Sequence, residues 1–211
     1  MSKKVVLMIL DGWGIAPNEK VSAVDAANTP FIDSLYPKYP HSKLEASGLA
    51  VGLPAGQMGN SEVGHMNLGA GRIVYQNLVR INKVVTENTL IEEPVLAEAF
   101  EYAKTNHKKM HFIGLVSDGG VHSHIEHLKS LCGAAHLAGL EKVFIHAFSD
   151  GRDTDPKGGL GYLTDLENTC KNTGARIASV TGRYFAMDRD KRWERVKKSY
   201  DAMVNGIGTL S

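Results

Sequence analysis

The chain has 211 residues, of which 43% are hydrophobic and 22% charged, values ordinary for a globular protein with a buried core. Its formal net charge of +1 excludes an overall field that would attract nucleic acid or an anionic membrane, so any basic site must be local. No apolar run is long enough to cross a bilayer. We therefore expect a soluble protein with no nucleic-acid or membrane partner, and the two cysteines without paired spacing favour a reducing, cytoplasmic setting.

A short apolar strand, a loop with glycine and charged residues, and an amphipathic helix recur along the chain. The predicted strands are, in chain order, Val5–Leu10, Met110–Val116, Val143–Phe148 and Ala175–Val180. The first is too short, and too soon followed by Asp11, to be a signal peptide. Nearly continuous apolar strands are typical of a parallel sheet covered on both faces, so the sequence predicts an α/β fold.

Helices are predicted between the strands from apolar residues at helical spacing, beginning at Thr29-Pro30 and at Pro94 and ending near Gly139 and Gly174. The residues expected to face inward are Val95, Ala99 and Ala103; Ile125, Leu128, Leu131 and Ala135; Leu160, Leu163 and Leu166; and Trp193, Val196 and Tyr200. The cysteines Cys132 and Cys170 lie on the apolar sides of two helices, which predicts buried free thiols. The glycine-rich stretch Gly48–Gly71 has no clear period and predicts a long functional loop.

Each predicted strand runs into a loop that contains charged residues. Because ligands bind beyond the carboxyl ends of the strands in an open parallel sheet, we expect a site where these loops converge.

Two oxygen-bearing side chains in the first third of the chain are candidates for catalysis. Asp11 directly follows a predicted strand, so its carboxylate can bind a hard divalent cation, although an aspartate there can equally form a turn. Ser61 lies in the segment Gly59–His65, at a junction of loop and helix where unpaired N–H groups favour an anion. The alternative for Ser61 is a helix cap in a flexible loop.

Three histidines, His122, His124 and His127, follow the second predicted strand. Imidazoles at this spacing are typical of a metal cluster, and the segment differs only by Glu126 from the His-x-His-x-Asp-His motif of metallo-β-lactamase-type hydrolases. Two other interpretations are that His122 binds a substrate and that the segment is the solvated start of a helix. The residues alone favour the metal cluster.

Arginines occur in the loops after the third and fourth predicted strands, as Arg152-Asp153 and as Arg183 and Arg189. A guanidinium group binds carboxylate or phosphate through two nitrogens, which suits a small, doubly anionic substrate. The alternative is surface ion pairing with neighbouring acids, namely Asp150, Asp155, Asp188 and Asp190.

Taken together, the motifs resemble cofactor-independent phosphoglycerate mutase of the alkaline phosphatase superfamily. They are Leu10-Asp11-Gly12-Trp13-Gly14, Asn28-Thr29-Pro30, Gly59-Asn60-Ser61-Glu62-Val63-Gly64-His65, Ser117-Asp118-Gly119-Gly120-Val121-His122-Ser123-His124, Asp150-Gly151-Arg152-Asp153 and Gly182-Arg183-Tyr184. They follow the order of the family along the whole chain, and the joint match is far more specific than any single motif.

The resemblance implies an alkaline-phosphatase-like metal domain built on a parallel sheet and interrupted by an inserted α/β phosphotransferase domain. Residues 1–75 would be the N-terminal segment of the metal domain. Residues 76–211 would be the substrate-binding phosphotransferase domain, incomplete at its C-terminus, because members of the family are much longer than this chain.

The activity implied is that of a glycolytic and gluconeogenic isomerase that interconverts 3-phosphoglycerate and 2-phosphoglycerate through a phosphoserine. Ser61 would be the nucleophile, and Asp11 and Ser61 would be ligands of a pair of manganese ions. The substrate-binding residues would be His122, Arg152, Asp153, Arg183 and Arg189. The resemblance thus replaces the metal-cluster interpretation of the three histidines.

We expect a monomer, and we expect this chain to be inactive by itself, because the family draws most metal ligands from its C-terminal half. Two rival hypotheses remain at this point. One is a metal-dependent hydrolase that uses His122, His124 and His127, and the other is a truncated protein that only binds phosphorylated acids.

Overall fold

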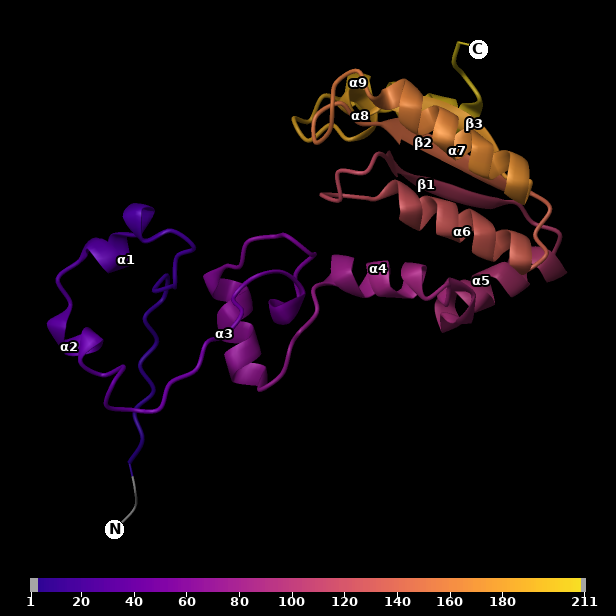
Figure 1. The fold of residues 1–211 in the computed structure, drawn as a ribbon. Helices are drawn as coiled ribbons and strands as arrows, with labels where there is room; N and C mark the ends of the chain where they lie inside the picture. The colour runs from indigo at the N-terminus through magenta and orange to yellow at the C-terminus, as the bar shows by residue number, and fades with distance from the viewer. Residues whose placement is uncertain (1–3, 210–211) are drawn as a thin grey trace. The chain divides into compact units, whose positions relative to one another are not determined.

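The computed structural model describes residues 4–209, and the chain divides into two compact units, one ending at Val79 and the other beginning at Arg80. In chain order its elements (Figure 1) are η1 (Glu19–Val21), α1 (Ala23–Ala26), α2 (Pro30–Asp33), η2 (Gly48–Val51), α3 (Ser61–Ala70), α4 (Asn77–Thr86), η3 (Leu90–Glu92), α5 (Pro94–Thr105), β1 (Met110–Val116), α6 (Ile125–Leu137), β2 (Val143–Ser149), α7 (Gly159–Thr173), β3 (Arg176–Gly182), α8 (Arg183–Ala186), α9 (Trp193–Tyr200) and η4 (Asp201–Asn205). Among residues 4–209, no helix combines the length and the apolar character that a membrane span requires.

The first unit has short helices and a small core of Val51, Leu53 and Val63. The strand predicted at Val5–Leu10 is wrong, because this segment forms no ladder and its side chains are 44–90% exposed. An extended segment becomes a strand only when a neighbour pairs with its N–H and C=O groups. Residues 4–79 contain no other strand to supply that partner.

The loop predicted over Gly48–Gly71 is also wrong in part, since the segment contains η2 and the ten-residue helix α3. The Asn60 side chain caps α3 by accepting a hydrogen bond of 3.0 Å from the backbone N–H of Val63. Glycines within α3 hide the apolar period. Gly59 is sterically required, because a Cβ there would lie 1.8 Å from the carbonyl oxygen of Ala46.

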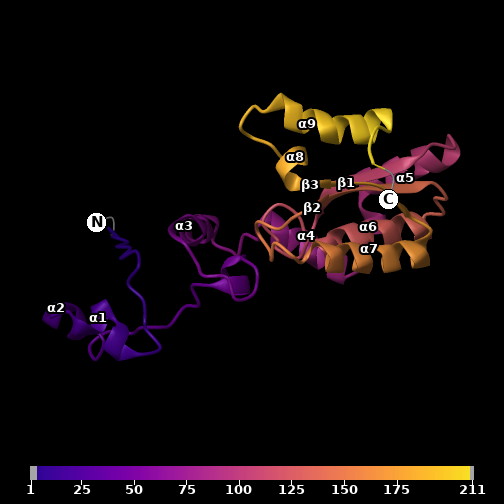
Figure 2. The same ribbon diagram turned by 90° about the horizontal axis from the view of Figure 1, so that it is seen from above.

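The second unit is built on a parallel sheet of order β1-β2-β3, as the apolar strands predicted. The observed β2 extends to Ser149, and β3 runs from Arg176 to Gly182. Figure 2 shows α6 and α7 on one face of this sheet and α8 and α9 on the other. The core lies under α6 and α7, where Ile145, Ala147 and Leu166 are fully buried.

Helix α6 follows the prediction closely. Ile125, Leu128 and Ala135 are buried, and Gly139 follows the helix at φ +81°, in the left-handed conformation that ends many helices. The thiols of Cys132 and Cys170 are free and buried, as predicted. Burial raises the pKa of the Cys132 thiol to about 12, which makes it an unreactive part of the core.

Several residues expected to face inward are exposed, namely Val95, Ala99, Leu160, Trp193 and Tyr200. In α5 the predicted Ala103 is buried as expected, and Phe100 fills the core in place of Val95 and Ala99. In α9 the less exposed side chains include Arg195 and Ser199. The Arg195 guanidinium packs over the Tyr184 ring of α8, 4.0 Å from the ring centre.

The outer face of the sheet holds a chain of polar side chains that the sequence did not predict. His146 on β2 is buried, and its Nδ1 is 2.8 Å from the Ser179 hydroxyl while its Nε2 is 3.0 Å from Nδ1 of His111. Burial is the main cause that lowers the pKa of His146, and neighbouring His111 lowers it further. A hydrogen bond between the facing nitrogens requires that one of them donates and the other accepts.

Two leucines on α7 provide a matched test of this core. Leu166 is 0% exposed and Leu160 is 79% exposed. We predict that Leu166→Ala lowers the free energy of unfolding by about 3 kcal/mol through lost burial and a cavity, whereas Leu160→Ala changes it by less than about 0.5 kcal/mol. Urea denaturation of both variants, followed by far-UV circular dichroism, measures the difference, and equal effects would contradict the assigned helix face.

Candidate functional site

The loops that follow β1, β2 and β3 meet at one buried carboxylate, Asp150. The Ser117 hydroxyl donates to Asp150 Oδ2 at 2.6 Å, and the Arg183 Nη1 donates to Asp150 Oδ1 at 2.8 Å. The backbone N–H groups of Arg152 and Asp153 each donate to Oδ1 at 3.0 Å. We call Ser117, Asp150, Asp153 and Arg183 the Asp150 cluster. It confirms the expected convergence of these three loops at the carboxyl ends of the strands.

The charge on Asp150 is set by these donors. Its side chain is only 1% exposed, and burial alone would raise its pKa. The hydrogen bonds from Ser117, the backbone of Asp153, Arg183 and the backbone of Arg152 outweigh that effect and hold the pKa of Asp150 well below its usual range. Asp150 is therefore a fixed negative charge at any physiological pH.

The carboxylates of Asp150 and Asp153 orient the Arg183 guanidinium, because both accept hydrogen bonds from its Nη1. Its Nη1 also donates to Asp153 Oδ2 at 2.6 Å, and the hydrogen bond to Asp153 is the main cause that raises the pKa of Arg183. Among the described residues, neither Nη2 nor Nε of Arg183 has a hydrogen-bond partner. Two donor nitrogens of a held guanidinium thus remain for a ligand.

The other three residues predicted to bind substrate occupy the same end of this unit. Nε2 of His122 lies 3.7 Å from Asp153 Oδ2, and the His122 side chain is half exposed. Arg152 follows β2 and Arg189 lies in the loop between α8 and α9. Both arginines are exposed, and within residues 4–209 their side chains make no hydrogen bond or ion pair. The surface ion pairs considered for them are therefore absent from the described part of the chain.

The three histidines have separate local roles. His124 caps α6 by accepting from the backbone N–H of Glu126 at 3.2 Å, and Nε2 of His127 donates to the Asn82 side-chain oxygen at 2.6 Å. Burial and the neighbouring His124 lower the pKa of His127. No group of three His, Cys, Asp or Glu residues in the described chain is arranged to hold a metal ion.

Sequence reasoning missed two contacts that shape the loops of the site. The Tyr162 hydroxyl on α7 donates to Asp118 Oδ1 in the loop after β1. Asp188, considered earlier only as an ion-pair partner, bonds instead to Arg195 at 3.2 Å and to nearby backbone N–H groups. The contact between Tyr162 and Asp118 joins residues 44 positions apart, so no local motif reveals it. Asp150 could have been found, because it directly follows a buried strand.

Asp11 and Ser61 belong to the first unit. Asp11 lies in a turn, is exposed and makes no side-chain hydrogen bond with a described residue. Ser61 is the first residue of α3, and its Oγ lies 3.2 Å from Nδ1 of His65. The same Nδ1 lies 2.8 Å from the Ser61 carbonyl oxygen. When Nδ1 carries a proton and donates it to that carbonyl, it cannot also accept from the hydroxyl.

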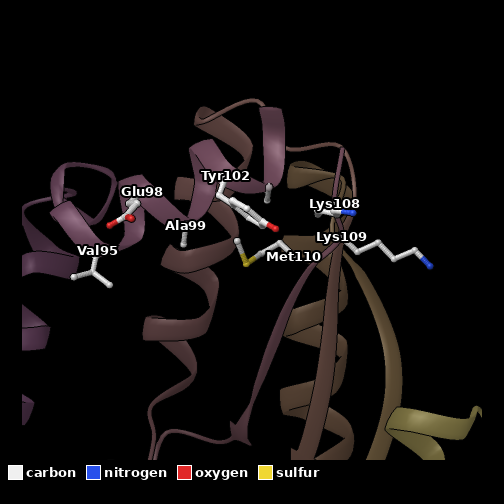
Figure 3. Close-up of a pocket in the computed structure, with 8 residues that line it drawn as sticks. Val95, Glu98, Ala99, Tyr102, Lys108, Lys109 and Met110 are labelled. Carbon is white, nitrogen blue, oxygen red and sulfur yellow. The ribbon is translucent and has the colours of Figure 1, made fainter. Parts of the chain in front are cut away.

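A pocket of about 440 Å³ lies at the opposite end of the sheet, between α5 and the start of β1. Figure 3 shows Tyr102, Glu98 and the consecutive residues Lys108 and Lys109 around it. This pocket lies apart from the Asp150 cluster. Ligands of open parallel sheets bind at the carboxyl ends of the strands, so this pocket is not the candidate site.

The fold is that of an α/β protein in which the loops at the carboxyl ends of a parallel sheet converge on the Asp150 cluster. Residues 81–211 match the family model described as BPG-independent PGAM N-terminus. The chain therefore belongs to the family of 2,3-bisphosphoglycerate-independent phosphoglycerate mutases.

Individual relatives agree with this assignment. The chain is 64% identical over 211 residues to the 2,3-bisphosphoglycerate-independent phosphoglycerate mutase of Flavobacterium johnsoniae, covering 100% of this chain and 42% of that protein. The protein of the same name from Clostridium perfringens is 57% identical over 210 residues, covering 99% of this chain and 41% of that protein. The chain thus spans about two fifths of the length of these relatives.

The chain also matches a crystal structure of Leishmania mexicana phosphoglycerate mutase determined at low cobalt concentration. It has a TM-score of 0.63 and 35% sequence identity, and the match covers 94% of this chain and 38% of that chain.

The Asp150 cluster makes a pH-dependent contribution to stability. We predict that Asp150→Asn lowers the free energy of unfolding at pH 7 by about 3 kcal/mol, because it leaves the buried Arg183 without one of its carboxylates. A carboxylate whose pKa is lowered by folding stabilises the fold fully above its unfolded pKa of 3.8 and loses that effect as the pH falls.

The difference between the parent chain and Asp150→Asn should therefore be constant at neutral pH and shrink below pH 3.8. Urea denaturation over a pH series measures it. A difference that stays the same down to about pH 2 would show that the charge of Asp150 is not what stabilises the loops.

Proposed function

We propose that this chain provides the phosphoryl-accepting serine and the glycerate-binding site of an enzyme that interconverts 3-phosphoglycerate and 2-phosphoglycerate. The observation on which the proposal rests is the Asp150 cluster, which holds Arg183 with two nitrogens unpaired among the described residues. His122 and Arg152 lie beside this cluster, on loops that follow β1 and β2. Membership of the phosphoglycerate mutase family supports the substrate assignment.

The substrate has two anionic groups and a free hydroxyl, and the second unit offers a partner for each. Arg152, Arg183 and Arg189 can bind carboxylate or phosphate oxygens through paired N–H groups. Asp153 and His122, 3.7 Å apart, can accept from and donate to the substrate hydroxyl. A substrate with a phosphate, a carboxylate and a hydroxyl could therefore use all five residues predicted from the sequence.

Ser61 is proposed as the residue that takes the phosphoryl group. Its position at the start of α3 places it where the helix N-terminus favours an added negative charge. The Ser61 oxygen forms a bond to phosphorus while the bond from phosphorus to the glycerate oxygen breaks, and overall that oxygen takes up the serine proton. The other glycerate hydroxyl then receives the phosphoryl group back from Ser61.

Retention of glycerate between the two transfers is assigned to the arginines. If glycerate leaves, phosphoserine can react only with water, and the enzyme becomes a phosphatase. Arg152, Arg183 and Arg189 would hold the carboxylate of glycerate while its hydroxyls exchange places at phosphorus.

The metal proposed is manganese, as a pair of ions in the complete enzyme, with Asp11 and Ser61 among the ligands. The carboxylate and hydroxyl oxygens are of the hard type that Mn²⁺ prefers, so the donors fit in kind. Such ions, when bound, lower the pKa of a coordinated hydroxyl and neutralise phosphoryl oxygens. The part of the chain that the structure describes provides no complete ligand set, so we assign the remaining ligands to the additional length found in the relatives.

The domain boundaries proposed are those of the sequence, with residues 1–75 in a phosphatase-like metal domain and residues 76–211 in the phosphotransferase domain. We also propose that the complete enzyme is a cytoplasmic monomer. The rival metal-dependent hydrolase has no support from the geometry, because His124 and His127 are engaged in a helix cap and in a bond to Asn82.

The role of Ser61 is tested in a full-length protein, by which we mean a polypeptide that contains this chain and has the length of its relatives. We predict that Ser61→Ala keeps the fold and loses mutase activity by a factor of about 10⁴ or more, because the phosphoryl group has no other acceptor. Ser47→Ala, in the same unit, is the control and should keep normal activity. Conversion of 3-phosphoglycerate is measured with manganese supplied, and substantial activity in Ser61→Ala would exclude this serine as the nucleophile.

The role of the arginines is tested by the fate of the phosphoryl group. We predict that Arg152→Ala in the full-length protein lowers mutase turnover by roughly tenfold or more, in line with the loss of a charge-assisted contact. Release of inorganic phosphate should persist or rise, because escaped glycerate leaves phosphoserine to water. Arg152→Lys should restore little, since a point charge does not reproduce the paired N–H groups.

The measurement is the ratio of inorganic phosphate released to 2-phosphoglycerate formed. Arg176→Ala is the matched control, because Arg176 is an exposed arginine at the opposite end of β3. An unchanged ratio in Arg152→Ala, Arg183→Ala and Arg189→Ala would mean that these arginines do not hold glycerate.

A further inference from the structure

The loop between α8 and α9 is organised by the side chain of Asp188. This carboxylate is only 1% exposed although it lies in a loop. Its Oδ2 accepts from the backbone N–H of Asp190 at 3.2 Å and from that of Arg192 at 2.8 Å, and its Oδ1 accepts from Arg195 Nη1 at 3.2 Å. One side chain thus fixes the loop on both sides of Lys191 and joins it to α9.

The conformation of this loop is not the one its residues prefer. Lys191 has a φ of +60°, in the left-handed region that side chains other than glycine seldom adopt. Such a conformation persists only where surrounding contacts hold it. The bonds from Asp188 to the residues on each side of Lys191 are contacts of that kind.

Arg195 connects the same loop to α8. Its guanidinium lies over the Tyr184 ring at 4.0 Å from the ring centre, and it is mostly buried beside Asp188. Tyr184 directly follows Arg183, whose guanidinium belongs to the Asp150 cluster. A continuous series of contacts therefore runs from Arg183 through Tyr184 and Arg195 to Asp188, which directly precedes Arg189.

We propose that Asp188 and Arg195 are positioning residues for substrate binding, which set Arg189 at a fixed distance from Arg183 so that both guanidinium groups bind one ligand. The inference rests on the proposed function, because it assumes that Arg189 contacts the substrate. Neither Asp188 nor Arg195 needs to contact the substrate. Their charges are satisfied by each other, and the ring of Tyr184 fixes the plane of the Arg195 guanidinium.

The first experiment examines the loop without reference to activity. Arg189, Lys191 and Arg192 are all cleavage sites for trypsin, so the rate of tryptic cleavage in this loop reports how well it is held. In the full-length protein, Asp188→Asn and Arg195→Lys should each raise that rate by roughly fivefold or more, because local opening becomes easier. Glu194→Gln is the control, since it removes only an exposed pair with Arg192 at 3.8 Å, and it should leave the rate unchanged.

The second experiment measures steady-state kinetics with 3-phosphoglycerate. We expect Asp188→Asn to raise the KM by roughly tenfold, because displacement of a positioned group weakens binding, while the Glu194→Gln enzyme keeps its KM. In an enzyme that already carries Arg189→Ala, Asp188→Asn should add little further effect, since the group that it positions is gone. A general loss of stability would instead raise the KM or lower kcat by the same factor in both backgrounds.

The outcomes separate the inference from the proposed function. If Arg189→Ala alone leaves the KM unchanged, Arg189 does not bind substrate, and both its proposed role and the positioning role of Asp188 and Arg195 fail. If Arg189→Ala raises the KM but Asp188→Asn does not, or if the two effects multiply independently, the proposed function stands and the positioning role is refuted. Unchanged tryptic cleavage in both Asp188→Asn and Arg195→Lys also refutes it. Should Asp188→Asn fail to fold, Arg195→Lys provides the same comparison with the charge retained.

Discussion

A carboxylate buried away from water is the constraint on which the rest of the second unit depends. An uncompensated charge in the position of Asp150, with a side chain 1% exposed, would be very unfavourable. Its compensation comes from a hydroxyl, two backbone N–H groups and a guanidinium, which lie at the ends of three different strands. Because one acceptor needs all of these donors, the loops after β1, β2 and β3 are fixed together. The geometry of the ligand site follows from that requirement.

The same cluster has an electrostatic consequence for the ligand. Two carboxylates, Asp150 and Asp153, face the single guanidinium of Arg183, so the cluster has a net negative charge. It orients Arg183 well but does not attract a dianion by itself. For the proposed substrate, long-range attraction would come from Arg152 and Arg189, which are exposed and unpaired among the described residues. The proposal thus divides orientation and attraction between different arginines, and the Asp188 contacts concern Arg189.

The sequence predicted the second unit well because its signals are local and strong. Continuous apolar strands, helical spacing in α6 and the loops after the strands each depend on residues close together in the chain. The motifs of the family suggested the roles proposed for Ser61 and the arginines, which no periodicity could supply.

Other features could not be predicted, for physical reasons that differ from case to case. Val5–Leu10 has the composition of a strand, but composition does not provide the neighbour that a strand must pair with. The outward position of Leu160 and Val95 depends on which turn of the helix meets the sheet, and spacing alone leaves this open by a residue or two. The bond of Tyr162 to Asp118 joins residues whose proximity arises only from tertiary packing.

The exposed segment Val5–Leu10 has a consequence for the behaviour of this chain in solution. Six consecutive apolar residues without charge, proline or glycine, 44–90% exposed, form the kind of short segment that stacks with copies of itself in cross-β order. An apolar, extended segment suits the interior of a sheet, but the same segment is prone to aggregate when it is exposed and unpaired. Because this segment pairs with no strand among the described residues, it would favour self-association of the chain at high concentration through residues outside the Asp150 cluster.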